Sequence, residues 1–379
     1  FPKKNWLDVM RAIVKTAERE PIRIEEYAQK LSSGIIDNGI IKIKNEDLDF
    51  KERLLQENIE EWSSEFDWEN GGLKRAPKFP LPNHLSFLLA VGVRHQNEQI
   101  LNYTELTLHK MAMGGIYDQI GGGFSRYAVD EIWKVPHFEK MLYDNGQLLS
   151  LYANAYKYFK NPYYKEICNG IVDWLKKEMV DDSGAFYSAL DADSEGEEGK
   201  YYCWTSKELK ELLLDDYEWV SDYYNVNQNG FWEKGKNILL KTESDGDFIK
   251  KMKWSQDEFN TNKSKIINIL NRARDLKIKP GLDNKKISSW NGIMLKGLCD
   301  AYSMEQDDSF LKLAISNAEW IVKEQIKNNT LIHCKTNTKN IEGFLEDYAF
   351  VVDAFISLYQ ITFEEKWLEK AKKLTEKSL

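Results

Sequence analysis

The segment Asp144-Asn145-Gly146-Gln147-Leu148-Leu149 decides the fold, because it recurs twice further along the chain. The second copy is Trp290-Asn291-Gly292-Ile293-Met294-Leu295, and the third is Asp347-Tyr348-Ala349-Phe350-Val351-Val352. In each copy a tyrosine follows at the same offset, and a large aromatic residue stands eight positions beyond it, as at Tyr156 and Tyr164. Self-similarity of this kind is the signature of a repeated supersecondary unit.

The repeated unit has the pattern of a helix hairpin. Apolar residues such as Leu148, Leu149 and Tyr152 recur at helical spacing. A short polar turn follows, as at 160–162, and its proline suits the first turn of a second helix, where no N–H is needed. The second helix ends in a glycine loop such as 182–187, because glycine accepts the left-handed conformation. We therefore expect an all-α toroid of helix hairpins whose glycine loops emerge at one end.

Other parts of the chain depart from this pattern. Residues 121–135 and 185–204 alternate between apolar and polar side chains, which predicts short β-hairpins at the mouth of a central cleft. Residues 226–250 are polar and give no clear prediction. Residues 1–50 contain two weaker helical patterns, at about 5–19 and 23–36, so we place the toroid domain at 51–379.

Composition excludes several classes of function. The net charge of −9 argues against nucleic-acid binding, which needs a basic face. No run of 18 apolar residues exists, so we expect no membrane span. The four cysteines, at 168, 203, 299 and 334, form no C-x-x-C pair, which excludes zinc ribbons and dithiol redox sites. Scattered cysteines fit buried thiols in a reducing compartment, and we expect a cytoplasmic location.

The candidate catalytic residues stand at predicted starts of inner helices. If residues 136–145 open such a helix, His137, Lys140 and Asp144 lie on one face, at i, i+3 and i+7. Asp144 shares its repeat position with Asp347, which follows Glu346. Carboxylates facing one another are the acid and base of glycoside hydrolysis, and histidine is the commonest general base. The predicted catalytic set is His137, Asp144, Glu346 and Asp347, and the alternative is a buried network that braces the glycine loops.

Residues around the same cleft are predicted to bind the ligand. The set is Arg126, Tyr127, Trp133, Lys140, Asp191, Asp193, Trp290 and Asn291. Segment 191–196 is similar to the opening of a calcium-binding loop, but Tyr202 stands where the loop needs a bidentate glutamate. We therefore expect an acidic loop that reaches over the cleft, no bound metal and no cofactor.

Several long motifs carry a resemblance to a known family. They are Gly72–Pro80, Gly114–Phe124, Val135–Asn145, Tyr187–Gly196 and Ser289–Gly292. These motifs resemble the spermatogenesis-associated protein 20 family, in which a thioredoxin-like domain precedes an (α/α)6 domain. That domain is similar in fold to N-acylglucosamine 2-epimerases and six-hairpin glycosidases. The resemblance implies six hairpins, incomplete here at the C-terminus, with residues 1–50 as linker helices after a thioredoxin-like domain that this chain lacks.

Two hypotheses about function follow. The first is a carbohydrate-active enzyme, epimerase-like or hydrolase-like, that uses inner-helix acid/base residues on a sugar-like ligand. The second is a non-catalytic binding or scaffold domain that serves the protein's own thioredoxin-like domain. The fold by itself does not decide between these two hypotheses.

Overall fold

The computed structural model describes residues 2–39, 52–335 and 340–378, and it divides into two compact units, Phe1–Trp62 and Ser63–Leu379. The first unit contains α1 (Lys3–Arg19), α2 (Pro21–Gly39) and most of α3 (Glu52–Ser63). The first two correspond to the helices expected near the N-terminus. None of the described helices is long and apolar enough to cross a bilayer.

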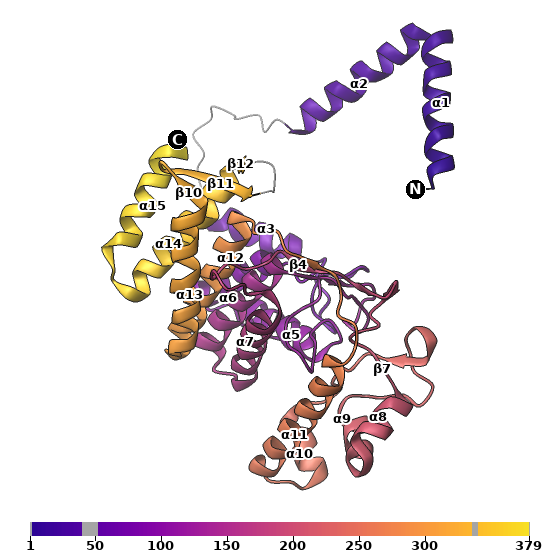
Figure 1. Cartoon of the computed structure of the whole chain (residues 1–379), viewed down its shortest axis with the longest axis vertical. Helices are drawn as coiled ribbons and strands as arrows, with labels where there is room; N and C mark the ends of the chain where they lie inside the picture. The colour runs from indigo at the N-terminus through magenta and orange to yellow at the C-terminus, as the bar shows by residue number, and fades with distance from the viewer. Residues whose placement is uncertain (1, 40–51, 336–339, 379) are drawn as a thin grey trace. The chain divides into compact units, whose positions relative to one another are not determined.

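The second unit is built from helix hairpins (Figure 1). The pairs are α4 (Pro82–His95) with α5 (Glu98–Met113), α6 (Leu142–Phe159) with α7 (Pro162–Trp174), α12 (Ser288–Glu305) with α13 (Asp308–Trp320), and α14 (Leu345–Thr362) with α15 (Glu365–Ser378). The inner helices α6, α12 and α14 pack side by side in that order. The expected all-α architecture of helix hairpins is thus confirmed.

The second residue of each repeat connects an inner helix to a loop. The Asn145 side chain accepts from the backbone N–H of Phe124, and Asn291 accepts from Phe186. In the third copy the hydroxyl of Tyr348 accepts from the N–H of Leu331. Each bond satisfies a buried backbone donor that would otherwise destabilise the fold. The repeated asparagine is therefore explained by the loop that it holds.

The glycine that follows each asparagine brings the inner helices close together. A Cβ on Gly146 would stand 2.9 Å from backbone atoms of Met294, and a Cβ on Gly292 would stand 2.9 Å from the backbone of Phe350. Only a residue without a side chain permits this approach.

Replacing Gly146 by alanine should therefore lower the free energy of unfolding by about 1–3 kcal/mol, because the backbone of α12 has to move. Urea unfolding measures this loss. The matched control is Gly246→Ala, whose Cβ would meet only the Ser244 hydroxyl at 3.9 Å. Gly246→Ala should leave the free energy of unfolding unchanged or raise it, since alanine favours a helix more than glycine does. Equal effects of the two substitutions would contradict the close-packing account.

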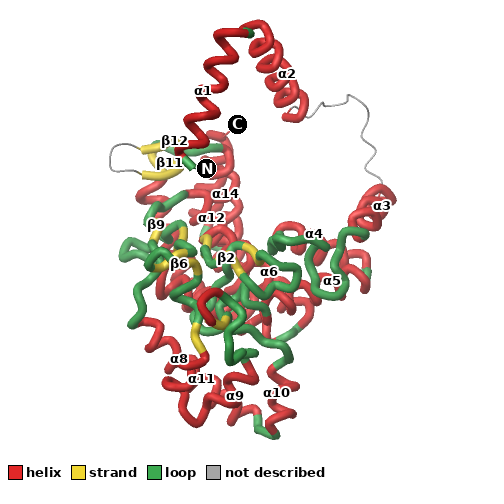
Figure 2. The backbone as a smooth tube through the Cα atoms, turned by 90° about the vertical axis from the view of Figure 1, so that its right-hand side faces the viewer, coloured by secondary structure: helices red, strands yellow, loops and turns green. Residues whose placement is uncertain are grey.

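Short strands lie among the loops that connect the helices (Figure 2). The pairs and sheets are β1 (Tyr127–Ala128) with β2 (Pro136–His137), β3 (Lys140–Met141) with β4 (Ala189–Leu190) and β9 (Leu282–Asp283), β5 (Asp193–Ser194) with β6 (Glu197–Glu198), β7 (Trp204–Thr205) with β8 (Lys236–Asn237), and β10 (Ile326–Lys327) with β11 (Thr330–Lys335) and β12 (Asn340–Glu342). The expected β-hairpins are confirmed.

One sequence prediction about these segments is wrong. Residues 136–141 do not open the inner helix, which begins only at Leu142. His137 pairs instead with Tyr127, and Lys140 pairs with Leu190, so this segment is extended. His137, Lys140 and Asp144 therefore do not share a helical face.

Residues 206–275 form a helical lobe with a core of its own (Figure 1). Its helices are α8 (Ser206–Leu213), α9 (Tyr217–Tyr223), α10 (Asp245–Met252) and α11 (Gln256–Asp275). Leu209, Val220, Phe248 and Phe259 are buried together in it. All four cysteines of the chain are free and buried, as expected from their spacing.

Candidate functional site

Asp144 lies in the first turn of α6 and is mostly buried. Its Oδ2 atom finds no hydrogen-bond partner among the residues that the structure describes. The pKa of Asp144 is raised to about 7, chiefly by burial; the nearby cation Arg126 opposes this rise, and the carboxylate of Glu139 adds to it. A carboxyl group with this pKa is found where proton transfer is needed, although burial alone can also produce it.

The groups around Asp144 come from three segments that are distant in sequence. Arg126 donates to Oε2 of Glu139 at 3.3 Å and also bonds to the hydroxyl of Tyr143. The Tyr143 ring meets the ring of Trp290 edge to face, with 4.8 Å between centroids. We call Arg126, Glu139, Tyr143, Asp144 and Trp290 the Asp144 site. It combines a protonatable carboxyl, an ion pair and two aromatic faces.

His137 lies beside this site, on β2. Its Nδ1 is 2.7 Å from Glu198, and its Nε2 is 3.7 Å from Glu139. The ring stacks on Tyr127 with 5.0 Å between centroids. Glu139 lies close to both His137 and Asp144, so these two residues are neighbours although they share no helical face.

A second acid–histidine pair lies at the start of α14. Asp347 is fully buried, and its carboxylate accepts from the backbone N–H groups of Ser289 and Phe344. It also contacts Nδ1 of His333 at 2.9 Å. This arrangement holds the imidazole ring and leaves its Nε2 for another partner. Sequence reasoning missed His333, because it stands on β11, outside the repeat.

The first turn of α12 connects the two groups. Ser289 donates its N–H to Asp347 at 2.9 Å, and the next residue, Trp290, contacts Tyr143 of the Asp144 site. The inner-helix starts therefore meet at one end of the unit, which agrees with the shared repeat position of Asp144 and Asp347.

The remaining predicted residues lie in two kinds of environment. Trp133 and Asn291 are buried, and their side chains donate to backbone carbonyls. Lys140 is also buried and donates to Asp118 and to the carbonyl of Gly122. Asp191 and Asp193 are exposed on the loop that carries β4 and β5. The structure thus does not bring these five residues into the Asp144 site.

The side chains of His333, Glu346 and Asp347 also have the geometry of a metal site. Ligand atoms of His333, Glu346 and Asp347 all lie within 4.8 Å of one another, with Glu346 exposed. Both Asp347 oxygens already accept N–H bonds from Ser289 and Phe344, however. That hydrogen bonding favours an orienting role for Asp347 over metal ligation.

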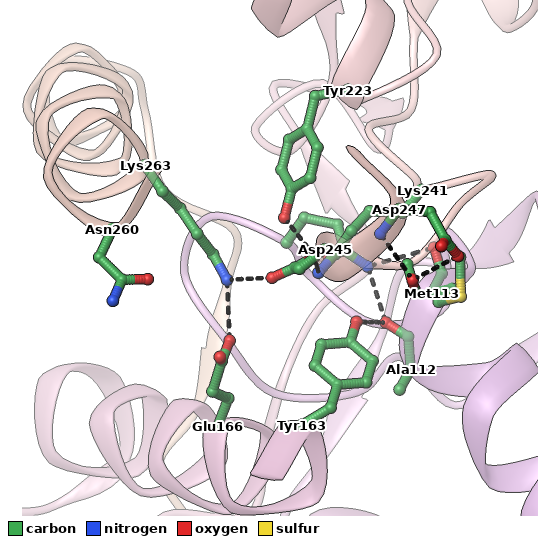
Figure 3. Close-up of polar contacts among 12 residues, drawn as sticks. Ala112, Met113, Tyr163, Glu166, Tyr223, Lys241, Asp245, Asp247, Asn260 and Lys263 are labelled. Carbon is green, nitrogen blue, oxygen red and sulfur yellow. Dashed lines mark hydrogen bonds and ion pairs between the residues drawn. The ribbon is translucent and has the colours of Figure 1, made fainter. Parts of the chain in front are cut away.

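A partly buried ion cluster joins the helical lobe to α7 (Figure 3). Asp245 accepts from Lys241 at 2.8 Å and from Lys263 at 2.9 Å, and Lys263 also pairs with Glu166 of α7. Burial lowers the pKa of Lys241 to about 8. Two cavities of about 460 and 440 Å³ share a wall made by Tyr163, Glu166 and Lys241. Sequence analysis missed this cluster, because Lys241 and Asp245 lie within the unassigned polar segment 226–250 and all four residues meet only through tertiary packing.

The chain has curated relatives, although no family model matches it. It is 31% identical to human spermatogenesis-associated protein 20 over 392 residues, which cover 92% of this chain and 50% of that protein. It is 32% identical to an uncharacterised protein of Caenorhabditis elegans, with 86% of this chain and 50% of the relative covered. The resemblance to the spermatogenesis-associated protein 20 family is confirmed, and the chain spans about half the length of these relatives.

Solved structures with a similar arrangement are more distant. One is a family 76 glycoside hydrolase from a bovine Bacteroides thetaiotaomicron strain, with 13% identity, a TM-score of 0.49, and 84% of this chain and 53% of the other covered. Another is a sugar epimerase from a ruminal bacterium, with 14% identity, a TM-score of 0.38, and coverage of 84% and 82%.

Proposed function

We propose that this relative of spermatogenesis-associated protein 20 performs acid/base chemistry on a neutral, polyhydroxylated ligand of the sugar class, at the start of its inner helices. The observation that carries the proposal is Asp144: a half-buried carboxyl whose Oδ2 atom is buried and unpartnered and whose pKa is raised to about 7. Both protonation states of such a group are populated at neutral pH, so it can donate and accept a proton efficiently.

His333 is the second proton-transfer group in this proposal. Asp347 holds its Nδ1 at 2.9 Å, as a carboxylate orients the imidazole of a catalytic pair, and Nε2 is left to meet the ligand. Asp347 then acts as a positioning residue. Glu346, exposed beside Asp347, and His137, paired with Glu198, supply further polar contacts for ligand hydroxyls.

The surroundings of Asp144 favour a sugar over a charged ligand. Tyr143 and Trp290 offer aromatic surface against which the apolar face of a sugar ring packs, while carboxylates accept from its hydroxyls. The cation of the site, Arg126, is already paired with Glu139. A phosphate or carboxylate ligand would meet Glu139 and Glu346 with like charge.

The test uses the full-length protein in D₂O with glucose, mannose, N-acetylglucosamine and cellobiose, followed by proton NMR. Epimerase-like chemistry replaces the hydrogen on the carbon next to the anomeric carbon with deuterium, and hydrolysis produces new reducing-end signals. His333→Gln should lower the observed rate roughly 10²–10⁴-fold. Asp308→Asn, which replaces an exposed acid in the first turn of α13, is the matched control and should leave the rate unchanged.

Two outcomes would contradict the proposal. One is a full-length protein that neither binds nor converts any of these sugars, which would support the non-catalytic scaffold function instead. The other is conversion that His333→Gln and Asp144→Asn leave unchanged, which would place the chemistry elsewhere.

A further inference from the structure

A second polar centre lies apart from the Asp144 site, where the loop before β1 meets α11. Arg274 binds Asp118 with both of its terminal nitrogens, at 2.7 and 3.0 Å. Lys140 donates to the same carboxylate at 2.9 Å and to the carbonyl of Gly122 at 2.7 Å. The side chains of Asp118, Lys140 and Arg274 are only 8%, 2% and 3% exposed.

The charges of this centre do not balance. Two buried cations share one carboxylate, which leaves one positive charge in excess. The acids and bases nearby do not offset it, because Glu178 pairs with Lys279 and Lys177 pairs with Asp275, each at 2.7 Å. An isolated buried charge is strongly destabilising, so a compensating negative charge is expected at this place.

Three buried donors in and beside this triad of Asp118, Lys140 and Arg274 also lack partners. They are the indole N–H of Trp174, the hydroxyl of Tyr202 and the Nε–H of Arg274, and none has a hydrogen-bond partner in the described part of the chain. Their residues are 2%, 8% and 3% exposed. Leaving a buried donor unsatisfied costs about 1–3 kcal/mol, so three in one place require an explanation.

The three residues that carry the unpartnered donors line one small cavity. They line it together with three lysines and two acids, and its volume is about 20 Å³. The lysines are Lys140, Lys177 and Lys279, and the acids are Asp118 and Glu178. A second cavity of about 20 Å³ shares Asp118, Tyr202 and Arg274 with it. Such a space holds one water-sized particle and is too small for phosphate or sulfate.

We propose that this cavity binds one small monovalent anion, with chloride as the physiological species, between Trp174, Tyr202 and Arg274. The anion accepts hydrogen bonds from the three unpartnered donors and neutralises the excess positive charge of Lys140 and Arg274. A water molecule would satisfy the donors but not the charge. The bound anion would connect α7, the 199–203 turn and α11, so the stability of the unit should depend on it.

The first test is the melting temperature of the full-length protein in sodium chloride against sodium gluconate at equal ionic strength. Gluconate is too large for the cavity, whereas chloride stabilises the folded state by mass action. We expect the melting temperature to rise by roughly 2–4 °C in chloride, and bromide should act in the same way. Equal melting temperatures in the two salts would overturn the proposal.

Crystals grown in sodium bromide give the direct test. An anomalous bromide peak between Trp174, Tyr202 and Arg274 is the expected result. A map with no peak there, or with water at that place, would contradict the proposal, even if chloride stabilised the protein through another site.

Variants separate this site from general salt effects. Trp174→Phe and Tyr202→Phe each remove one unpartnered donor while keeping an aromatic ring, and each should reduce the chloride-dependent shift by half or more. The matched control is Tyr158→Phe, at an exposed tyrosine of α6 that lies outside the cavity. A shift that survives in both donor variants would count against the assignment, and the wild-type measurements remain decisive if either variant fails to fold.

Discussion

Replacing Asp144 by asparagine should stabilise the protein at pH 8 while it removes the proposed acid/base activity. The pKa of Asp144 is raised by burial to about 7, from an ordinary value of 3.8. Between these values the folded state binds more protons than the unfolded state, so stability falls as pH rises from 4 to 7. Above pH 7 the buried charge is fully formed, and its destabilising effect is complete.

The size of this effect follows from the shift. A shift of about three units corresponds to roughly 4 kcal/mol, and the remaining solvent contact of Asp144 reduces this to about 1–3 kcal/mol. Urea unfolding at pH 8 should show that gain for Asp144→Asn, and at pH 4 the gain should vanish, because wild-type Asp144 is then protonated. Asp308→Asn should show no such pH-dependent gain.

The same variant decides between a functional and a structural Asp144. Loss of sugar conversion by roughly 10²–10⁴-fold together with higher stability identifies a group retained for chemistry at the expense of stability. Lower stability at pH 8 would mean instead that the carboxylate has a structural partner, and it would remove the main support for the proposed function.

Replacing Asp118 by asparagine should be the most destabilising single substitution considered for this protein. Burial alone would raise the pKa of Asp118, but Arg274 and Lys140 together hold it well below its ordinary range. The neutral amide leaves two buried cations without a carboxylate, and breaking a buried ion pair in this way costs about 3–5 kcal/mol. The melting temperature or the urea midpoint measures this loss.

A double variant keeps this prediction testable if Asp118→Asn does not fold. Adding Lys140→Met removes one of the two buried cations, so the pair Asp118→Asn with Lys140→Met should recover part of the lost stability. A loss below about 1 kcal/mol for Asp118→Asn alone, or no recovery in the double variant, would show that the triad contributes little to the fold.

The sequence by itself determined the hairpin architecture. The repeat at Asp144, Trp290 and Asp347 specifies helices through apolar side chains at helical spacing, and spacing of this kind is a local property of the chain. It also placed the starts of these helices together, because equal positions in stacked hairpins lie at equal height. Within the candidate site, the convergence of Asp144 and Asp347 on one end could therefore be predicted.

Only the tertiary structure decided what surrounds those residues. Residues 136–141 read as the start of a helix, yet they are extended, because β1 and β4 supply hydrogen-bond partners from outside the segment. His333 reaches Asp347 from a strand outside the repeat, and Lys140 finds Asp118 and Arg274, the latter 134 positions away. Such contacts depend on which side chains lie close together in the folded chain and on how far each is removed from solvent. Helical spacing therefore fixed the scaffold, whereas burial and long-range pairing fixed the charge and the partner of each polar group on it.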